Sequence, residues 1–165
     1  RNQYGKDFVS LMPTNLYGPF DNFDFNTSHV LPAMIRKFHD AKESNHGPVT
    51  LWGSGTPMRE FLFVDDMAEA VLYALENILP EYLYNVGTEE DLTIKQLAGT
   101  IQRTVGHQGE IIWDSSKPDG TPRKLMDISK MHGLGWKHQV QLEEGILKTY
   151  EWFLENLGSF KEVKM

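Results

Sequence analysis

The chain has 165 residues, a formal net charge of −7 at pH 7 and no cysteine. The negative charge predicts that it does not bind nucleic acid nonspecifically, and the lack of cysteine excludes disulfides and thiolate metal sites within the chain. No apolar run approaches the ~20 residues that a transmembrane helix needs, and no signal-peptide pattern is visible, so we expect a cytoplasmic protein with no membrane partner and no metal.

The first third of the chain predicts a strand, a turn-rich segment and a helix. Residues 8–12 ("FVSLM") form an apolar run that indicates a short buried strand. The stretch "MPTNLYGPFDNF" (12–23) combines turn formers with Asn, Tyr and Asp, which is typical of a strand end at a ligand pocket. Apolar residues at helical spacing then predict a helix over 29–42, with Ser28 as its N-cap.

The rest of the chain alternates predicted strands and helices, an order that indicates α/β architecture. At one helix start, Thr93 and Gln96 match a capping box. A helix from Asp65 has an apolar face made of Met67, Val71, Ala74, Leu75 and Ile78. A last helix over 142–157 is predicted to bury Leu142, Ile146, Tyr150, Phe153, Leu154 and Leu157. The other predicted pieces are strands at 49–52, 60–64, 82–86 and 110–113, an extended piece at 123–128 and a frayed end at 161–165.

The segment "WGSGTPMREF" (52–61) does not match a dinucleotide-binding loop. Such a loop needs a third glycine followed directly by a helix, whereas Met stands at position 58 and the next residues form a predicted strand. Gly53 and Gly55 are therefore assigned to a tight turn. No Gly-rich cofactor loop therefore occurs anywhere in the chain.

Two residues beside this turn have both a structural and a binding interpretation. Arg59 is either a surface residue paired with Glu60 or Asp65, or a planar cation that holds a diphosphate through two parallel hydrogen bonds. Trp52 is either a core residue or a stacking surface for a nucleobase or a sugar at a pocket rim. The local sequence leaves both questions open.

The first helix and a late loop contain the other polar candidates. His29 is either a cap or surface residue or a general acid, since histidine ordinarily titrates near neutral pH. Lys37 lies two turns further along roughly the same side of that helix and faces either solvent or a bound phosphate. The loop "SKPDGTPRK" (116–124) is either a solvated loop or a lid over a ligand. Its charged residues are Lys117, Asp119, Arg123 and Lys124.

These segments resemble, in order and spacing, one family of sugar-nucleotide enzymes. They are "MPTNLYGPFDNF", "NTSHVLPAMIRKF", "VTLWGSGTPMREFLFVDDMAEA", "YNVGT" and "SKPDGTPRKLMDISK", followed by "LGW". Together they resemble the C-terminal half of the GDP-L-fucose synthases, NADPH-dependent epimerase-reductases of the extended short-chain dehydrogenase/reductase superfamily. The resemblance covers nearly the whole chain, and "SHVLPA", "WGSGTPMREF" and "KPDGTPRK" are its narrowest parts.

The resemblance implies a fold and a reaction. The fold would be the last part of a Rossmann-like NAD(P)-binding sheet plus a smaller α/β substrate-binding lobe. Residues 1–28 would end the Rossmann domain, and residues 29–165 would form mainly the substrate lobe, with some segments returning to the Rossmann domain. Family members are homodimers that convert GDP-4-keto-6-deoxy-D-mannose to GDP-L-fucose, by epimerisation at C3 and C5 and reduction at C4. The implied cofactor is NADP(H), and the implied ligand is a GDP-sugar.

The resemblance also implies roles for individual residues. His29 matches the catalytic histidine, which lies near the nicotinamide. The cofactor-contacting segment matches Pro13, Thr14, Asn15 and Leu16. The residues that match substrate contacts are Lys37, Trp52, Arg59, Asp119 and Lys124, with Arg59 as the diphosphate ligand.

Several motifs of the family pattern are missing from the chain. The family's Gly-rich cofactor loop, catalytic Ser, epimerisation Cys and Tyr-x-x-x-Lys pair have no counterpart in these 165 residues, and Tyr4 and Lys6 are too close together to supply that spacing. We therefore predict that the chain alone does not turn over substrate. Two alternatives remain. One is another sugar-nucleotide epimerase or dehydratase of the superfamily, and the other is a noncatalytic nucleotide-sugar-binding module.

Overall fold

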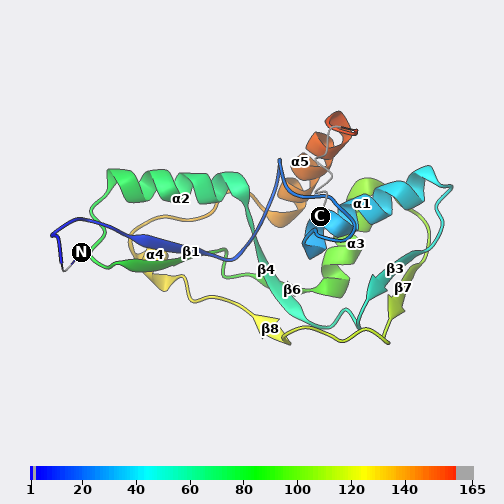
Figure 1. Cartoon of the computed structure of the whole chain (residues 1–165), viewed down its shortest axis with the longest axis horizontal. Coiled ribbons are helices and arrows are strands. Elements are labelled where there is room, and N and C mark those ends of the chain that lie inside the picture. The colour runs from blue at the N-terminus through cyan, green and yellow to red at the C-terminus, as the bar shows by residue number, and fades with distance from the viewer. Residues whose placement is uncertain (2, 159–165) are drawn as a thin grey trace.

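The strands of the computed structural model form three small sheets within the described residues, 1 and 3–158. Strand β4 is the central strand of the largest sheet and lies in the middle of the molecule (Figure 1). It pairs in parallel with β2 and β8 and antiparallel with β6. The bounds of these strands are β2 Asn15–Tyr17, β4 Met58–Phe63, β6 Asp91–Thr93 and β8 Arg123–Lys124.

The other two sheets are parallel pairs of short strands. One pairs β1 (Ser10–Pro13) with β5 (Leu83–Val86), and the other pairs β3 (Val49–Trp52) with β7 (Ile111–Asp114). Each parallel pair joins segments that lie far apart in sequence, and helices intervene, as parallel pairing requires. The observed α/β architecture with parallel sheets confirms the predicted fold class.

The helices lie on two sides of β4. Helices α1 (Val30–Glu43), α3 (Ile94–Val105) and α5 (Leu142–Glu155) share one side, where α1 contacts β3, α5 contacts β4, and α3 contacts both α1 and α5 (Figure 1). Helices α2 (Val64–Glu76) and α4 (Ser129–Gly133) lie beside β1 on the other side. None of the described helices is both long and apolar enough to cross a bilayer.

Strand β4 contributes to two hydrophobic clusters because successive side chains of a strand point to opposite faces. Phe61 and Phe63 belong to the cluster formed with α1, α3 and α5, whereas Leu62, between them, belongs to the cluster formed with β5 and α4. Within the described residues these clusters form the core. The division of the chain into residues 1–28 and 29–165 remains a prediction.

Two helix starts give opposite outcomes for the predicted caps. At α3, the Thr93 hydroxyl accepts the Gln96 backbone N–H and the Gln96 side chain accepts the Thr93 backbone N–H, so the predicted capping box is confirmed. Ser28 is not the cap of α1: the N-cap residue is His29, and no side chain caps this helix. The Ser28 hydroxyl is instead buried without a hydrogen-bond partner among the described residues.

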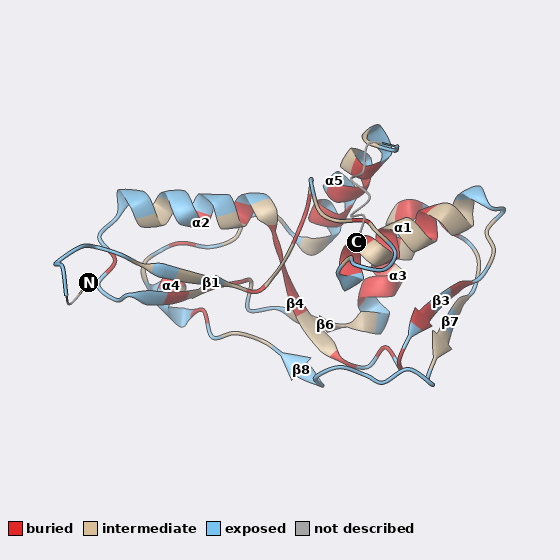
Figure 2. Cartoon of the chain, in the orientation of Figure 1, coloured by how far each residue is buried: buried red, intermediate tan, exposed pale blue. Residues whose placement is uncertain are grey.

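Three predicted apolar segments are more exposed than expected. Val71 and Leu75 on α2 are exposed because the core contacts this helix through its other side, which carries Asp66 and Ala70, and Ile78 is exposed after the helix has ended (Figure 2). The prediction that Leu154 and Leu157 are buried is wrong, because Leu154 near the end of α5 and Leu157 after this helix both lie past the last core contact at Phe153. The predicted buried strand at 8–12 is partly wrong, since Phe8 and Met12 are exposed. The predicted fraying at 161–165 lies outside the described residues.

Candidate functional site

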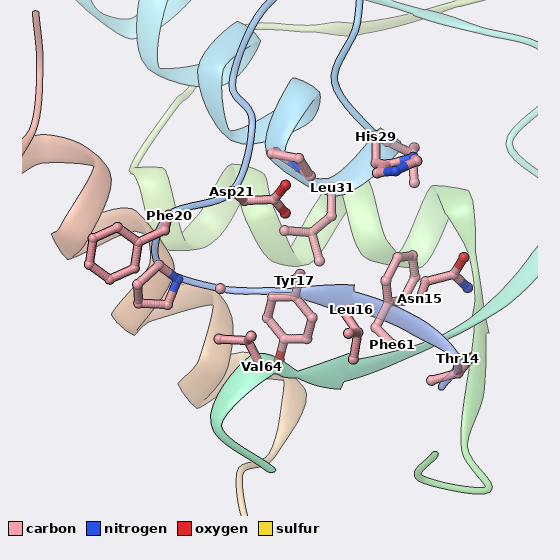
Figure 3. A pocket seen from close by; sticks show the side chains of 14 residues that line it. Thr14, Asn15, Leu16, Tyr17, Phe20, Asp21, His29, Leu31, Phe61 and Val64 are labelled. Atoms are coloured by element: carbon pink, nitrogen blue, oxygen red, sulfur yellow. The ribbon is translucent and has the colours of Figure 1, made fainter. Parts of the chain in front are cut away.

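The larger of two neighbouring cavities has a volume of about 710 Å³ and lies between β2, the end of β4 and the start of α1. Figure 3 shows Leu16, Phe61 and Val64 along the strands, with Asp21 and His29 on the side of α1. The strand side of the wall thus combines apolar side chains with Thr14, Asn15 and Tyr17, and the α1 side carries Asp21 and His29. Its lining residues are Thr14 to Asp21, His29 to Pro32, Phe61 and Val64.

A tight turn after β2 shapes one wall of this cavity. Gly18 has φ 151°, and a Cβ at this position would lie 2.5 Å from Val64 Cγ1, so only glycine fits against α2. Phe20, two residues on, has φ 67°, a conformation that is rare for a side chain of this size. The chain therefore reverses sharply here and places Asp21 beside the start of α1.

Burial raises the pKa values of two groups that line the larger cavity. The pKa of the Asp21 carboxyl is raised by burial, although the Asn22 backbone N–H donates to it at 2.7 Å and His29 lies close enough to oppose the shift. The pKa of the Tyr17 hydroxyl is also raised, first by burial and then by Asp66 and Glu144. Tyr17 is therefore a neutral donor at physiological pH, and it donates to the Leu142 carbonyl at 3.4 Å.

The second cavity, of about 210 Å³, adjoins the first. Asn15 and Val30 line both cavities, so they form the boundary between His29 on one side and Arg59 on the other. The remaining lining residues of the smaller cavity are Trp52, Gly55, Pro57, Arg59, Ile94, Pro118, Asp119 and Gly120. The structure therefore places the predicted imidazole and guanidinium in adjacent concavities.

Arg59 points into the smaller cavity and is held by backbone oxygens. Its Nη1 donates to the Met58 carbonyl at 2.7 Å and to the Thr121 carbonyl at 2.6 Å. It forms no ion pair with Glu60 or Asp65, so the interpretation of Arg59 as one member of such a surface pair is wrong. The physical reason is that Glu60, on the opposite face of β4, is completely buried.

Trp52 is 71% exposed, so its interpretation as a core residue is wrong. Two lysines lie near its ring: Lys37 Nζ is 5.9 Å and Lys117 Nζ is 5.6 Å from the ring centroid. Lys37 also donates to the Thr50 carbonyl at 3.2 Å, and burial lowers the pKa of its ammonium group. An exposed aromatic face flanked by cations suits a ligand that combines a flat ring with phosphate.

The loop between β7 and β8 is fastened over the smaller cavity by Asp119. Its carboxylate accepts the Ser54 backbone N–H at 2.8 Å and the Ser54 hydroxyl at 2.6 Å, and these bonds lower its pKa. Gly53 has φ 80°, and a Cβ there would collide with the Asp119 carboxylate. Gly53 therefore makes room for this clasp, whereas Gly55, with φ 75°, makes room for the Trp113 ring; both positive φ values agree with the assignment to a tight turn.

The structure brings most of the predicted site residues around the two cavities. Thr14, Asn15, Leu16 and His29 line the larger cavity, and Trp52, Arg59 and Asp119 line the smaller one. Lys37 lies beside Trp52, whereas Pro13 and Lys124 line neither cavity; Lys124 is exposed on β8. Among the described residues, no group of three or more His, Asp or Glu side chains is placed to hold a metal ion.

Sequence reasoning assigned no site role to Tyr17, Asp21, Phe61 or Val64, which line the larger cavity. Tyr17 and Asp21 belong to the turn-rich segment that the sequence marks as a pocket edge, so a signal for them existed. Phe61 and Val64 gave no such signal, because an apolar residue in a buried strand is ordinarily part of the core. Only the parallel pairing of β2 with β4 brings them to the cavity.

Curated relatives match nearly the whole chain. It is 54% identical over 168 residues to GDP-L-fucose synthase of Escherichia coli (strain K12), covering 96% of this chain and 52% of that protein. It is also 54% identical over 162 residues to probable GDP-L-fucose synthase 1 of Oryza sativa subsp. japonica, covering 98% and 49%. These similarities confirm the resemblance that the sequence motifs indicated. The chain spans about half the length of the curated relatives that it matches.

A solved structure and a family model agree with these relatives. The crystal structure of a GDP-L-fucose synthetase from Naegleria fowleri bound to NADP superposes with a TM-score of 0.87 at 33% identity, covering 94% of this chain and 49% of that one. The model of the NAD dependent epimerase/dehydratase family matches residues 1–87, more than half of the chain. The chain therefore belongs to the NAD dependent epimerase/dehydratase family.

Proposed function

We propose that this chain is the GDP-sugar-binding half of a GDP-L-fucose synthase, which converts GDP-4-keto-6-deoxy-D-mannose to GDP-L-fucose with NADPH. The observation that carries the proposal is the shared boundary of the two cavities. Asn15 and Val30 separate a cavity that contains His29 from one that contains Arg59. A nucleoside diphosphate sugar has its charged diphosphate next to its sugar, so two adjoining concavities of this kind match its length and its chemistry.

The smaller cavity suits the diphosphate and the base. Arg59 uses Nη1 for two backbone carbonyls, which fixes the plane of its guanidinium toward the cavity. Such a planar cation binds phosphate oxygens through charge-assisted hydrogen bonds. Trp52 offers an exposed face for stacking, and Lys37 adds positive charge beside it. In this proposal Asp119 holds the loop that covers the ligand, and Lys124 contributes charge from β8.

The larger cavity suits the reacting sugar and the nicotinamide. The apolar side chains of Leu16, Phe61 and Val64 fit a flat uncharged ring, while Asn15 and His29 supply polar groups. When bound, NADPH supplies the hydride that reduces the C4 ketone. Pro13 and Thr14 would support this cofactor edge from the end of β1.

His29 has the chemistry that the epimerisation needs. The C4 ketone acidifies the protons on C3 and C5, so inversion requires a group that returns a proton to the opposite face of each carbon. His29 is exposed at the N-cap position of α1 and opens into the larger cavity. We therefore assign the His29 imidazole as the proton donor of this site.

The proposal includes the partners and location of the whole enzyme. The finer assignments are a multifunctional oxidoreductase and isomerase, a homodimer, and a cytoplasmic location without nucleic-acid or membrane partners. Residues 1–28 would end the cofactor domain, and residues 29–165 would form mainly the substrate lobe. Because the chain carries no Gly-rich loop and no Tyr-x-x-x-Lys pair, it would bind the nucleotide sugar but not complete the reaction alone.

Nucleobase preference tests the proposal directly. Isothermal titration of the chain with GDP, UDP and dTDP should give the tightest binding for GDP. Preference for UDP or dTDP would instead support another sugar-nucleotide epimerase or dehydratase. Absence of binding to all three nucleotides would refute the assignment of the smaller cavity to a nucleoside diphosphate.

A further inference from the structure

Glu60 is a fully buried carboxylate in the middle of β4. Its Oε1 accepts the backbone N–H groups of Thr88 at 2.6 Å and Glu89 at 2.9 Å, and the Thr88 hydroxyl at 3.4 Å. Its Oε2 accepts the backbone N–H of Met126 at 3.3 Å. No Lys, Arg or His of the described chain forms an ion pair with it. Hydrogen bonds alone therefore compensate its burial.

The turn after β5 is built around this carboxylate. A Cβ at Gly87 would collide with Glu60 Oε1 and lie 2.9 Å from Cδ, so the residue beside the carboxylate has to be small. Glu89 adopts φ 64°, a left-handed conformation that is unfavourable for a residue with a side chain. Its N–H points at Glu60 Oε1, and this bond supports the strained conformation.

The backbone of Glu60 is tied to the cofactor edge of the site. Its carbonyl oxygen accepts the Asn15 side-chain amide at 2.7 Å and the Thr14 hydroxyl at 3.3 Å. Asn15 is one of the two residues at the boundary of the cavities. Arg59, the residue before Glu60 on β4, lines the smaller cavity. It is the register partner of Lys124 in the parallel pair of β4 and β8.

These bonds make Glu60 the junction of three segments that surround the two cavities. They are the start of β2, the turn after β5 and the stretch that follows β8. We propose that Glu60 is a positioning residue. Its buried carboxylate fixes β4 against the turn after β5 and the stretch after β8, and β4 so fixed holds Asn15, through the Glu60 carbonyl, and Arg59 in the arrangement that binds the nucleotide sugar. Hydrogen bonds to an ionised acceptor are stronger than neutral ones, and a buried donor left unpaired is strongly unfavourable. This inference rests on the proposed function, because its first measurement is nucleotide binding.

The test compares Glu60→Gln with Asp66→Asn in the same chain. Asp66 is also buried and accepts two backbone N–H groups, from Gln139 and Val140, but it lines neither cavity. Both variants keep the shape of the side chain and replace one acceptor oxygen with an NH₂ group. Glu60→Gln should raise the Kd for GDP by about ten-fold or more, whereas Asp66→Asn should change it by less than about two-fold.

A GDP affinity of Glu60→Gln close to that of the parent chain would overturn the inference. An equal loss in both variants would also overturn it, because the effect would then reflect general stability. If Glu60→Gln does not fold, Gly87→Ala replaces it, because the added methyl pushes on the carboxylate without removing its charge. The expected result for Gly87→Ala is likewise weaker GDP binding, with unchanged binding overturning the inference.

A second readout separates this inference from the proposed function. If the parent chain itself fails to bind GDP, the proposed function fails, and the NMR signals of the Arg59 side-chain Nε–H and the Asn15 side-chain amide decide the positioning role. Both signals should shift in Glu60→Gln and remain in place in Asp66→Asn. Unchanged Arg59 and Asn15 signals in Glu60→Gln would show that the carboxylate does not position them.

Discussion

Two helical glycines should respond to the same substitution with opposite signs. In α3, a Cβ at Gly99 meets nothing closer than Arg103 Nη1 at 3.7 Å. In α5, a Cβ at Gly145 would collide with the Tyr17 hydroxyl, at 2.9 Å from Tyr17 Cζ and 3.1 Å from Phe63 Cδ2. The Tyr17 ring has little freedom to move, since it is buried and packs edge-on against Phe63 at a centroid distance of 5.7 Å.

The expected magnitudes follow from these contacts. Gly99→Ala should stabilise the fold by about 0.5–1 kcal/mol, because alanine loses less backbone entropy than glycine in a helix. Gly145→Ala gains a similar amount but overpacks the core, which typically costs about 1–3 kcal/mol, so the net effect should be a loss of up to ~2.5 kcal/mol. In a Tyr17→Phe background the loss should shrink, because the atom closest to the new methyl group is gone.

Urea unfolding followed by circular dichroism and by tryptophan fluorescence measures both effects. The two probes must report the same transition before free energies are compared, because the described core consists of two clusters. A stabilising Gly145→Ala would refute the packing of α5 on Tyr17. An equal loss with and without the Tyr17 hydroxyl would show that the collision involves another group.

Three further outcomes are expected. Arg59→Ala should weaken GDP binding by about 2–3 kcal/mol through lost charge-assisted hydrogen bonds. Arg103→Ala, an exposed arginine on α3, is its control, and equal calorimetric Kd values for the two variants would contradict the diphosphate role. The chain alone should oxidise no NADPH with the ketosugar, and a measurable loss of NADPH absorbance would disprove this. Hydrogen bonds from Ser54 lower the pKa of the Asp119 carboxyl, so the clasp should persist at neutral pH and be lost only as the pH falls through that lowered pKa. A Ser54 amide signal that titrates at a pH as high as that of a free aspartate would contradict the clasp.

The sequence predicted those elements that depend only on residues close together in the chain. The capping box at Thr93 and Gln96 depends on residues three apart, and the tight turn at Gly53 and Gly55 depends on backbone freedom, so both could be recognised without a fold. Strand β2 was missed because turn formers surround "NLY", and its strand conformation comes from pairing with β4, far away in sequence.

The sequence pointed to polar residues of the candidate site, but it could not predict the hydrogen bonds that connect them. The local sequence left His29, Arg59 and Trp52 open between structural and binding roles, and the resemblance to the family then marked them as site residues. Glu60 was considered only as a surface partner of Arg59, because charged residues are rarely buried. Its burial depends on amide donors from Thr88 and Glu89, which only the folded chain brings to it.

The central claim is that Arg59 and His29 serve one bound nucleotide sugar. NMR titration of the chain with GDP-mannose, compared with GDP alone, tests it most directly, because the side-chain signals of both residues can be followed in one experiment. GDP should shift the Arg59 signal with little effect on His29, and GDP-mannose should shift both with the same apparent Kd. Saturating GDP-mannose that leaves the Arg59 and His29 signals unchanged would contradict the account.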